Sequence, residues 1–540
     1  MNTPSDSKRT PCRTGDSQGA RRLASTLRQG GVDHCFANPG TTEIAILTAL
    51  EAQNGMKVVL CLSEGVVTGA ADGFGRMSGR PALTLMHCGP GFANGVANLH
   101  NARRACSPIV NLIGDHPDWH AIVDPPLASD VESLARPVSD WVRRASSAET
   151  VAYDAHEALS VASRNPGRVA TLIVPSDCQW SHANSAFVLP PPSTNGNQPA
   201  LIADQRIRRF TRLLEQYSDR AVLLLGGGGL SASALESAAR IASHTGVRLM
   251  CTGFPARMEQ GGGLPQIERI PYIAAAAEAL FEDVELVVLA GTPEPVRYFA
   301  DETRCTRLIP EHVGIDTLAT SLEAVDTALE QLANQLRAHA FKPSVASPVE
   351  PPRGRLSGHT VALALAATLT EQAVVVDEGV SIAGSYLRIC EGTPRHSYLS
   401  LTGGACGQGL PLAVGASIAS PERRVVAIVG DGSAMYTIQA LWTQAKHALD
   451  ITTVIYANDG YRILEAELTQ RMGVTSPSVL FGKSSIDWTG LARNFGVPAS
   501  RADTAEELVT ALREAMARTG PTLIEARATQ SIPVVGGLHG

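Results

Sequence analysis

The chain has 540 residues, of which 44% are apolar and 18% charged, and its formal net charge is −7. This composition is typical of a soluble globular protein, and the mildly acidic balance disfavours nucleic acid or an anionic membrane as a partner. No uninterrupted apolar run approaches the ~20 residues of a membrane helix, and ten scattered cysteines without a CxxC pair favour a reducing cytoplasm over disulfides or a zinc site.

The length predicts roughly three domains of ~150 residues, and two linkers divide the chain accordingly. The polar residues 1–17 are expected to form a flexible tail. Linkers at 188–200 and 341–358 are rich in Pro, Ser and Gly or Asn, which interrupt periodic structure. The expected domains therefore span 18–187, 201–340 and 357–535.

Short apolar runs alternate with helical stretches along all three segments. In chain order, the predicted strands are 57–63, 81–87, 108–114, 169–175, 221–229, 284–291, 373–379, 424–432, 451–459 and 521–528. A helix rich in Ala and Ser is expected over 231–246. Such alternation predicts βαβ units, and hence an α/β protein with three doubly wound parallel-sheet domains in series.

In the last segment, an acid and an amide follow two successive strands. Asp431 lies between glycines in GDGS, and Asn458 follows the next strand in ANDGY. Between them, residues 433–449 are predicted to form one helix with Ser433 as its N-cap. Because the carboxyl ends of parallel strands share one sheet edge, both residues are expected at the edge where open α/β sheets bind ligands.

These residue types suit Mg²⁺ and a diphosphate. Mg²⁺ takes a few protein oxygens and completes its coordination with phosphate and water. The predicted ligands are the Asp431 carboxylate, the Asn458 amide oxygen and the Gly460 carbonyl. Gly432 lets the backbone approach a phosphate near a helix N-terminus. A tight strand–helix turn with a capping Asp is the alternative, which the matching Asn disfavours.

The stretch GDGSAMYTIQALWTQAKHALDITTVIYANDGY resembles the thiamine diphosphate (ThDP) motif, in which GDG is followed some two dozen residues later by Asn. From about 18 to 535, the chain is similar to acetolactate synthase large subunits and benzoylformate decarboxylase. The resemblance implies pyrimidine-binding, central and diphosphate-binding domains, with ThDP and Mg²⁺ as cofactors. It also implies a homodimer or homotetramer with the active site at the dimer interface. Many members have Asn where this chain has Ala457.

ThDP chemistry requires a carboxyl group beside the cofactor's aminopyrimidine, and the resemblance assigns this role to Glu64. In SEGVVTGAADG, Glu64 follows a strand and precedes a helix of small residues, and Ala71-Asp72-Gly73 completes the family pattern. A mostly apolar pocket would let such a group share a proton. The alternative is a solvated carboxylate in the first turn of a helix.

The resemblance also implies residues on the substrate side. NPGTTE at 38–43 is similar to a loop that carries a Ser in benzoylformate decarboxylase, and Thr41 takes its place. His87 stands where that enzyme has a catalytic His, and its ordinary pKa suits proton transfer at neutral pH. A strand-end His bonded to backbone is the alternative. A second His is missing around 253–272, where Arg257 or Gln260 could fill the space.

Further cofactor contacts are implied by position. Ser381 would contact the diphosphate, the Gly404 carbonyl would accept from the 4′-amino group, and Cys406 replaces a bulky residue that bends ThDP. The remaining expected contacts adjoin Asp431 and Asn458: Gly432, Ser433, Gly460 and Tyr461. Residues 462–485 are expected to cover the site. The glycine run at 226–229 resembles a dinucleotide turn, but glycine serves turn geometry in general, so FAD is not favoured.

The implied reaction is decarboxylation of a small 2-oxo acid, with the cofactor as electron sink. The expected activity is decarboxylation with carboligation, as in an acetolactate synthase that uses pyruvate. The alternative is a simple decarboxylase of an aryl or branched 2-oxo acid. A non-catalytic ThDP-binding paralogue is disfavoured because Glu64, Asp431 and Asn458 are all present. An NAD-dependent dehydrogenase built on the glycine run lacks a clear fingerprint.

Overall fold

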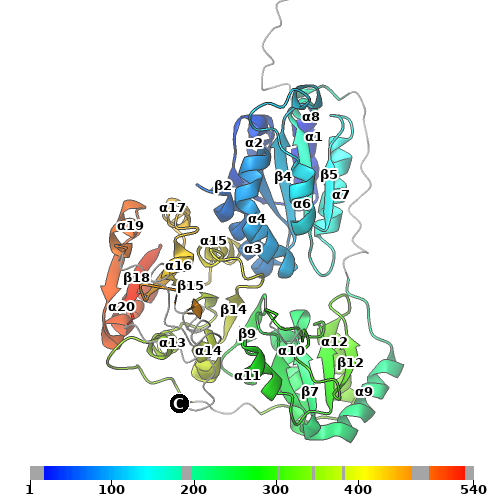
Figure 1. Ribbon diagram of the computed structural model, residues 1–540, viewed down its shortest axis with the longest axis vertical. Coiled ribbons are helices and arrows are strands. Elements are labelled where there is room, and N and C mark those ends of the chain that lie inside the picture. The colour runs from blue at the N-terminus through cyan, green and yellow to red at the C-terminus, as the bar shows by residue number, and fades with distance from the viewer. Residues whose placement is uncertain are drawn as a thin grey trace, which may run out of the picture.

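The computed structural model describes residues 18–183, 198–300, 305–342, 347–379, 383–461, 463–464 and 486–528. Within these ranges the chain forms three mostly parallel sheets flanked by helices, which Figure 1 shows at the top, lower right and lower left. The prediction of a three-domain α/β protein is confirmed. The predicted tail, Ser381 and most of the expected cover at 462–485 lie outside the described residues.

The N-terminal domain is built on a six-stranded parallel sheet in the order β2-β1-β3-β4-β6-β5. Its strands are β1 His34–Asn38, β2 Lys57–Leu60, β3 Ala82–His87, β4 Ile109–Asp115, β5 Trp141–Arg144 and β6 Val169–Pro175. Its helices are α1 Gln18–Gln29, η2 Thr41–Glu43, α2 Ile44–Glu51, α3 Glu64–Ser78, α4 Cys88–Arg104, α5 Asp118–Ala121, α6 Val131–Ala135, η3 Arg136–Val138, α7 Val151–Ala162 and α8 Ser176–Trp180. β4 and β6 are buried along their whole length, as expected for strands covered by helices on both faces.

The central domain has a five-stranded parallel sheet in the order β10-β8-β7-β11-β12. Its strands are β7 Ala221–Leu225, β8 Arg248–Cys251, β10 Glu268–Arg269, β11 Leu286–Ala290 and β12 Gly314–Ala319. Its helices are α9 Asp204–Tyr217, η5 Ser218–Arg220, η6 Gly227–Leu230, α10 Ala232–Thr245, α11 Ala274–Ala279 and α12 Val325–Gln335. The predicted helix over 231–246 is thus observed, and the Ser231 hydroxyl caps it by accepting from the backbone N–H of Ala234.

The C-terminal domain carries a seven-stranded sheet in the order β17-β18-β16-β15-β13-β14-β9. Its own strands are β13 Val374–Glu378, β14 His396–Ser400, β15 Val425–Gly430, β16 Ile451–Ala457, β17 Ala499–Ala502 and β18 Thr522–Arg527. Its helices are α13 Gly358–Ala366, α14 Ala383–Ile389, η7 Cys390–Gly392, α15 Gly409–Ala419, α16 Asp431–Ala434, α17 Ala440–Lys446, α19 Trp488–Asn494 and α20 Ala505–Ala517.

Two local predictions differ from the structure. β9, Met258–Gln260, comes from the central segment but pairs antiparallel with β14, so one edge of the C-terminal sheet is neither parallel nor local in sequence. The single helix expected over 433–449 is instead α16 and α17, and α16 has Gly430 rather than Ser433 as its N-cap. Between these helices, the Thr437 hydroxyl donates to the Gly407 carbonyl at 2.8 Å, a tertiary contact that helix periodicity does not reveal.

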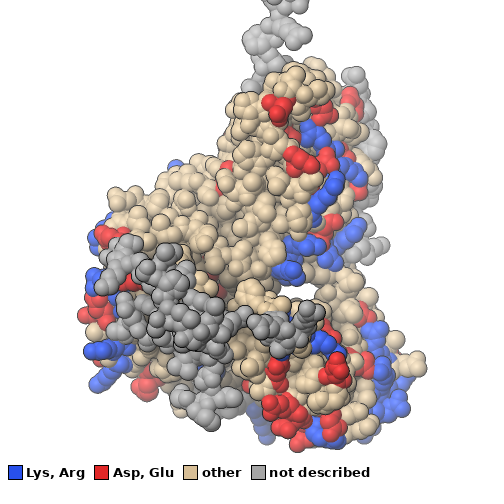
Figure 2. Space-filling view, in the orientation of Figure 1, with Lys and Arg blue, Asp and Glu red and all other residues tan. Residues whose placement is uncertain are grey.

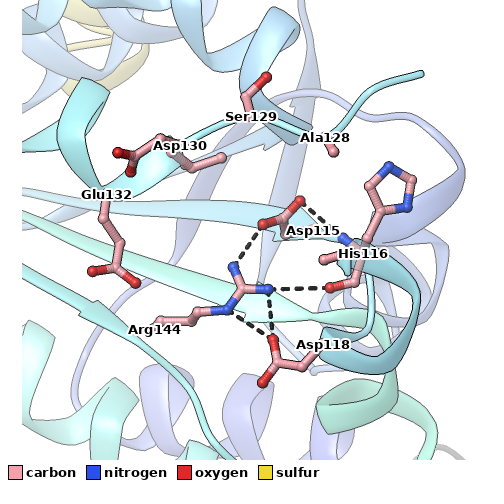
Figure 3. Close-up of a pocket in the computed structure, with 10 residues that line it drawn as sticks. Asp115, His116, Asp118, Ala128, Ser129, Asp130, Glu132 and Arg144 are labelled. Carbon is pink, nitrogen blue, oxygen red and sulfur yellow. Dashed lines mark hydrogen bonds and ion pairs between the residues drawn. The ribbon is translucent and has the colours of Figure 1, made fainter. Parts of the chain in front are cut away.

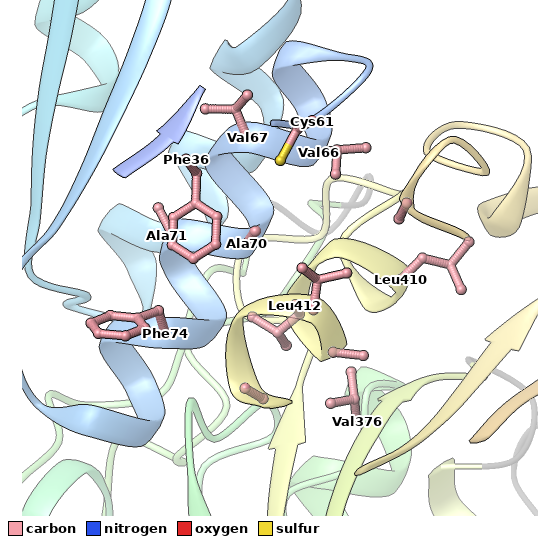
Figure 4. Close-up of a cluster of buried hydrophobic side chains, with 14 of the residues drawn as sticks. Phe36, Cys61, Val66, Val67, Ala70, Ala71, Phe74, Val376, Leu410 and Leu412 are labelled. Atoms are coloured by element: carbon pink, nitrogen blue, oxygen red, sulfur yellow. The ribbon is translucent and has the colours of Figure 1, made fainter. Parts of the chain in front are cut away.

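Helices α3 and α15 join the N- and C-terminal domains through one hydrophobic core (Figure 4). Their backbones come very close, because a Cβ on Gly73 would lie 2.0 Å from the Leu412 carbonyl oxygen and one on Gly415 would lie 1.8 Å from that of Ala70. Only glycine fits at these two positions. The small-residue helix that follows Glu64 is therefore a packing surface between domains.

A buried ion pair fixes the same junction. Arg76 donates to both carboxylate oxygens of Asp72 at 2.8 and 2.7 Å, one turn away on α3. The guanidinium also donates to the backbone carbonyl of Ala256 at 3.2 Å and to that of Ser400 at 2.7 Å. Because these carbonyls belong to the central and C-terminal domains, one side chain ties all three domains together.

Charge is unevenly distributed over the surface. In Figure 2, Lys, Arg, Asp and Glu crowd the central domain and the right side of the N-terminal domain, whereas the face over α2, α4 and α17 carries few of them. The N- and C-terminal domains also expose several apolar side chains: Ile44, Leu60, Leu62, Met435 and Tyr436 are 43–61% exposed. Among the described residues, no helix has the length and hydropathy required to cross a membrane.

Candidate active site

The Glu64 carboxylate lies at the carboxyl edge of the N-terminal sheet, where α3 begins. The Asn38 amide, at the end of β1, donates to Oε1 at 2.9 Å, and the Asn94 amide, on α4, donates to Oε2 at 3.2 Å. Glu64 is only 9% exposed. A Cβ on Gly91 would come within 3.1 Å of Oε1, so glycine keeps the volume beside the carboxylate open. Two neutral amides thus hold a largely buried acid in one orientation.

His87 ends β3 on the same edge, and its imidazole is about a quarter exposed, at 23%. Its Nδ1 lies 3.0 Å from the Glu43 Oε2 and 3.0 Å from the Thr42 hydroxyl. Thr41, whose hydroxyl was expected in the site, is exposed on η2, and the neighbouring Thr42 contacts the His87 ring. Sequence reasoning did not single out Glu43, although it stands two residues from Thr41 in the same motif.

Asp431 and Asn458 meet at the corresponding edge of the C-terminal sheet. Asp431 Oδ2 accepts from the backbone N–H groups of Asn458 at 3.0 Å and Asp459 at 2.8 Å, while Oδ1 accepts from Gly432 at 2.8 Å. Burial raises the pKa of Asp431 in spite of these hydrogen bonds, and the nearby Asp459 carboxylate raises it further. The Asn458 amide oxygen accepts from the Gly460 N–H at 3.3 Å. A cation would stabilise a buried carboxylate in such a setting.

A second buried acid of this domain, Glu378, lies behind the loop of residues 402–409, hereafter the 402–409 loop. Its carboxylate accepts from the backbone N–H groups of Gly407 and Gly409 at 2.6 Å each. Burial raises the pKa of Glu378 to about 7, against the hydrogen bonds from Gly409, Gly407, Gln408 and the Ser433 hydroxyl. Burial also raises the pKa of the Cys406 thiol, and the Glu378 charge adds to that rise. In the sequence, Glu378 is marked only by its position near the end of the predicted strand 373–379.

The 402–409 loop is held by all three domains. The Thr402 hydroxyl donates to the Asn101 carbonyl at 2.7 Å, and the Asn101 side chain exchanges two hydrogen bonds with the Ala405 backbone at 2.8 and 3.1 Å. From the central domain, Tyr298 places its hydroxyl against Gly404, where a Cβ would lie only 1.9 Å away. Gly404 also has φ +79°, so a side chain is disfavoured there on two grounds.

The structure directs the two expected central-domain residues elsewhere. Arg257 pairs with Glu259 at 2.9 Å and donates to backbone carbonyls at the end of α3. Gln260 is buried in β9 and accepts from the Cys390 thiol at 2.8 Å. Tyr298 reaches the 402–409 loop instead. Tyr298 follows β11, and no motif or spacing in the sequence indicates that it would contact this loop.

Tyr298 belongs to a group of aromatic side chains beside this loop. Its ring centroid lies 5.5 Å from that of Phe254, 5.1 Å from that of Tyr272 and 5.1 Å from that of Phe299. Tyr298 is 43% exposed and Phe299 is 58% exposed. The group therefore presents an aromatic surface next to Gly404.

The glycine run of the central domain has a structural role. Gly226 and Gly291 end two neighbouring strands, and a Cβ on Gly291 would lie 2.2 Å from the Gly226 carbonyl oxygen. The run thus permits close backbone packing after β7 and β11.

A cavity of about 250 Å³ lies at the end of β4, near the Glu43–His87 pair but lined by different residues (Figure 3). Arg144 crosses it and donates to Asp115 at 2.6 Å and to Asp118 at 2.8 Å. Asp130 and Glu132 complete an acidic lining. Two carboxylates already bind the Arg144 guanidinium. The cavity therefore resembles a structural ion-pair site more than a reaction site.

The residues at the carboxyl edges of the N- and C-terminal sheets lie within matches to two domain models of one enzyme family. The model described as "Thiamine pyrophosphate enzyme, N-terminal TPP binding domain" matches residues 17–124, and its C-terminal TPP binding domain counterpart matches residues 381–526. The chain is 43% identical over 516 residues to "Putative acetolactate synthase large subunit IlvX" of Mycobacterium tuberculosis, which covers 94% of this chain and 98% of that protein. The chain belongs to the thiamine pyrophosphate enzyme family.

This thiamine diphosphate-dependent enzyme is similar to proteins of different activity. It is 30% identical to benzoylformate decarboxylase of Pseudomonas aeruginosa, over 94% of this chain and 98% of that protein. A solved thiamine diphosphate-dependent 4-hydroxybenzoylformate decarboxylase of Rhodococcus jostii RHA1 has the same fold, with a TM-score of 0.83 at 24% identity, covering 95% of this chain and all of that chain. The enzyme is therefore related to both acetolactate synthases and benzoylformate decarboxylases.

Proposed function

We propose that this enzyme decarboxylates a 2-oxo acid with the help of ThDP and Mg²⁺ and releases the corresponding aldehyde. The observation that carries the proposal is the setting of Glu64. Its carboxylate is largely buried, is fixed by the Asn38 and Asn94 amides, and adjoins Gly91, where a side chain would crowd it. An acid in this setting can share a proton with an aminopyrimidine.

The C-terminal edge fits the diphosphate end of the cofactor. Asp431, Asn458 and Gly460 offer a carboxylate, an amide oxygen and a backbone carbonyl, which are the hard oxygen donors that Mg²⁺ prefers. Gly432 and Ser433 would contact the diphosphate, and the Tyr461 ring lies against Gly432, where a Cβ would be 2.7 Å from it. Ser381 stays a predicted contact.

When bound, ThDP supplies the electron sink that lets the bond to CO₂ break. Glu64 would hold the proton that the cofactor's aminopyrimidine needs, and the Gly404 carbonyl would accept from its amino group. Cys406 would pack against the cofactor from the 402–409 loop. His87 would hold the proton that replaces CO₂, and the hydroxyls of Thr41 and Thr42 would orient the substrate.

The aromatic group around Tyr298 favours a 2-oxo acid with an aromatic or large apolar side chain over pyruvate. The Tyr298 hydroxyl lies beside Gly404, and the rings of Phe254, Tyr272 and Phe299 pack against the Tyr298 ring. Aromatic rings gain about 0.5–1.5 kcal/mol from such packing beyond the area they bury. Similarity to benzoylformate decarboxylase points the same way.

Carboligation is the second candidate. It is favoured by the 43% identity to the acetolactate synthase-like relative. In that case, the carbon that lost CO₂ would be joined to a second carbonyl compound, giving a 2-hydroxyketone. The reaction is then acetolactate synthase-like, with pyruvate as donor.

We further propose that the active unit is a homodimer or a larger homo-oligomer. The charge-poor face of the N- and C-terminal domains is suited to a second copy, because few Lys, Arg, Asp or Glu side chains lie on it (Figure 2). Exposed large apolar side chains such as Ile44, Leu62 and Tyr436 are typical of an interaction site when they adjoin one another. The Glu64 edge of one copy would then face the Asp431 edge of the other.

The first experiment measures CO₂ release with ThDP and Mg²⁺ over pyruvate, branched 2-oxo acids and benzoylformate, with products identified by chromatography. Glu64→Gln is expected to lower kcat about 10²- to 10⁴-fold, the usual contribution of general acid–base catalysis. ThDP binding should be retained. Asp154→Asn is the matched control, since Asp154 is a buried carboxylate (5% exposed) on α7.

An aldehyde from benzoylformate, lost in Glu64→Gln, supports the proposed function. Acetolactate from pyruvate would select carboligation. If ThDP binds but no acid on the panel reacts, the decarboxylase proposal fails and a non-catalytic paralogue becomes the better description.

A further inference from the structure

Glu43 is a fully buried carboxylate beneath His87, with side-chain exposure of 0%. It accepts from the Gly40 backbone N–H at 2.7 Å, from the Thr42 hydroxyl and from the imidazole Nδ1 at 3.0 Å. A carboxylate removed from water in this way requires several hydrogen-bond partners. His87 supplies the partner that faces the predicted substrate side.

The surrounding chain makes room for this pair. A Cβ on Gly114, at the end of β4, would lie 2.1 Å from Glu43 Oε1. One on Gly40 would lie 2.4 Å from Cγ of the His87 ring. Both partners therefore occupy volumes that any other residue at positions 40 and 114 would fill. The arrangement is built into two segments of the domain and is not a chance contact of one side chain.

A metal site is the competing interpretation, because one ligand atom each of Glu43, His87 and Cys88 lie within 4.8 Å of one another. Burial raises the pKa of the Cys88 thiol to about 11, although a hydrogen bond with Thr42 opposes the rise. The thiolate, not the thiol, is the metal ligand. His87 Nδ1 also lies within direct hydrogen-bond distance of Glu43 Oε2, at 3.0 Å, so the geometry supports a carboxylate–imidazole pair.

The hydrogen bonds define the chemistry of the ring. Glu43 is an acceptor, so Nδ1 carries the hydrogen that it receives, and Nε2 is the nitrogen left for the substrate. When Nε2 also carries a proton, the ring is positively charged. The Glu43 carboxylate beside it then stabilises that charge. Carboxylates act in this manner on catalytic histidines of unrelated folds.

We infer that Glu43 is a positioning residue that fixes the tautomer and orientation of His87, so that Nε2–H delivers the proton that replaces CO₂. The inference rests on the proposed function. When the bond to the carboxyl carbon breaks, its electron pair stays on the former carbonyl carbon, and the proton from Nε2 goes there. Water then reprotonates His87. The sum is one 2-oxo acid anion and one proton converted to one aldehyde and CO₂.

A double-mutant cycle in kcat tests this inference, with the acid on the panel that reacts fastest. His87→Ala is expected to lower kcat by about 10²- to 10⁴-fold. Glu43→Gln should produce most of that loss in kcat with little change in KM. The double variant should be no slower than His87→Ala alone, because Glu43 acts only through His87. Asp154→Asn, a buried carboxylate of the same domain, should retain wild-type kcat.

The inference is overturned if Glu43→Gln costs the same factor in the presence and absence of His87, since that is the signature of a purely structural role. It is also overturned if Glu43→Gln leaves kcat unchanged. If wild-type protein turns over no acid, the proposed function fails. The ¹⁵N spectrum of histidine-labelled protein, with His87→Ala to identify the signal, then decides whether Nδ1 carries the hydrogen in wild type and loses that preference in Glu43→Gln.

Discussion

The N- and C-terminal sheets have the same strand order but carry different chemistry at their carboxyl edges. Read from one side, the first is β2-β1-β3-β4-β6-β5, and the second, apart from β9, is β14-β13-β15-β16-β18-β17. The third strand of each domain leads to His87 in one sheet and to Asp431 in the other. The fourth leads to Asp115 and to Asn458 respectively.

The difference teaches that this scaffold fixes where functional side chains stand, while residue identity decides what they do. The N-terminal edge gathers Glu64, His87 and Glu43, which can hold and move protons. The C-terminal edge gathers oxygen donors around Asp431, which suit a cation. The strands of a parallel sheet all end at the same edge. Residues that are distant in sequence therefore come together at the edge of each sheet.

The largest expected effect comes from breaking the C-terminal edge. Asp431→Asn removes the carboxylate proposed to hold Mg²⁺, and ThDP affinity in the presence of Mg²⁺ should fall by more than the about 10–100-fold typical of outer-shell changes at metal sites. Titration of apoprotein with ThDP at fixed Mg²⁺, followed by fluorescence or calorimetry, measures it. Glu64→Gln should bind ThDP with an affinity within a few-fold of wild type. Equal losses of affinity in both variants would contradict the assignment of cofactor binding to the C-terminal edge and of proton transfer to the N-terminal edge.

A mixing experiment tests whether the two edges combine across subunits. Neither Glu64→Gln nor Asp431→Asn homodimers should be active. Randomly mixed dimers contain one site with both Glu64 and Asp431 intact, so activity should return to roughly a quarter of wild type. Co-refolding or co-expression of the two chains, followed by CO₂ assay, gives the answer. Absence of any recovery, with mixed dimers demonstrated by mass spectrometry, would mean that each site takes both residues from one chain.

The smallest effect concerns Glu378, the buried acid of the C-terminal domain, whose pKa burial raises to about 7. Between pH 4.5 and 7 the folded apoprotein binds a proton that the unfolded chain has released. The proton bound by Glu378 therefore adds to the free energy of unfolding below about pH 4.5. As pH rises to about 7, this stabilisation is lost, and the free energy of unfolding falls by on the order of 3 kcal/mol. The difference in unfolding midpoint between wild type and Glu378→Gln should shift in this direction across that range. A difference independent of pH would show that Glu378 ionises as freely as in the unfolded chain.

Much of the fold was predictable because its signals are local. Apolar runs at 169–175 and 451–459 predicted buried strands, and the observed β6 (169–175) and β16 (451–457) are buried throughout. The same pattern placed Asp431 directly after a strand, as observed, and placed Glu64 between β2 and the helix that Glu64 begins. β9 and the break between α16 and α17 were not predictable, because they depend on pairing with β14 and on the contact between Thr437 and Gly407.

The sequence by itself determined the α/β class, the three-part division and the residues that form the cofactor motif, since periodicity and glycine–acid spacing are properties of neighbouring positions. Only the tertiary structure decided which residues support them. The contacts of Glu43 and Thr42 with His87, of Tyr298 with Gly404 and of Glu378 with the 402–409 loop are all consequences of packing between distant segments. Contacts of that kind depend on the approach of whole helices and strands, which no short stretch of sequence specifies.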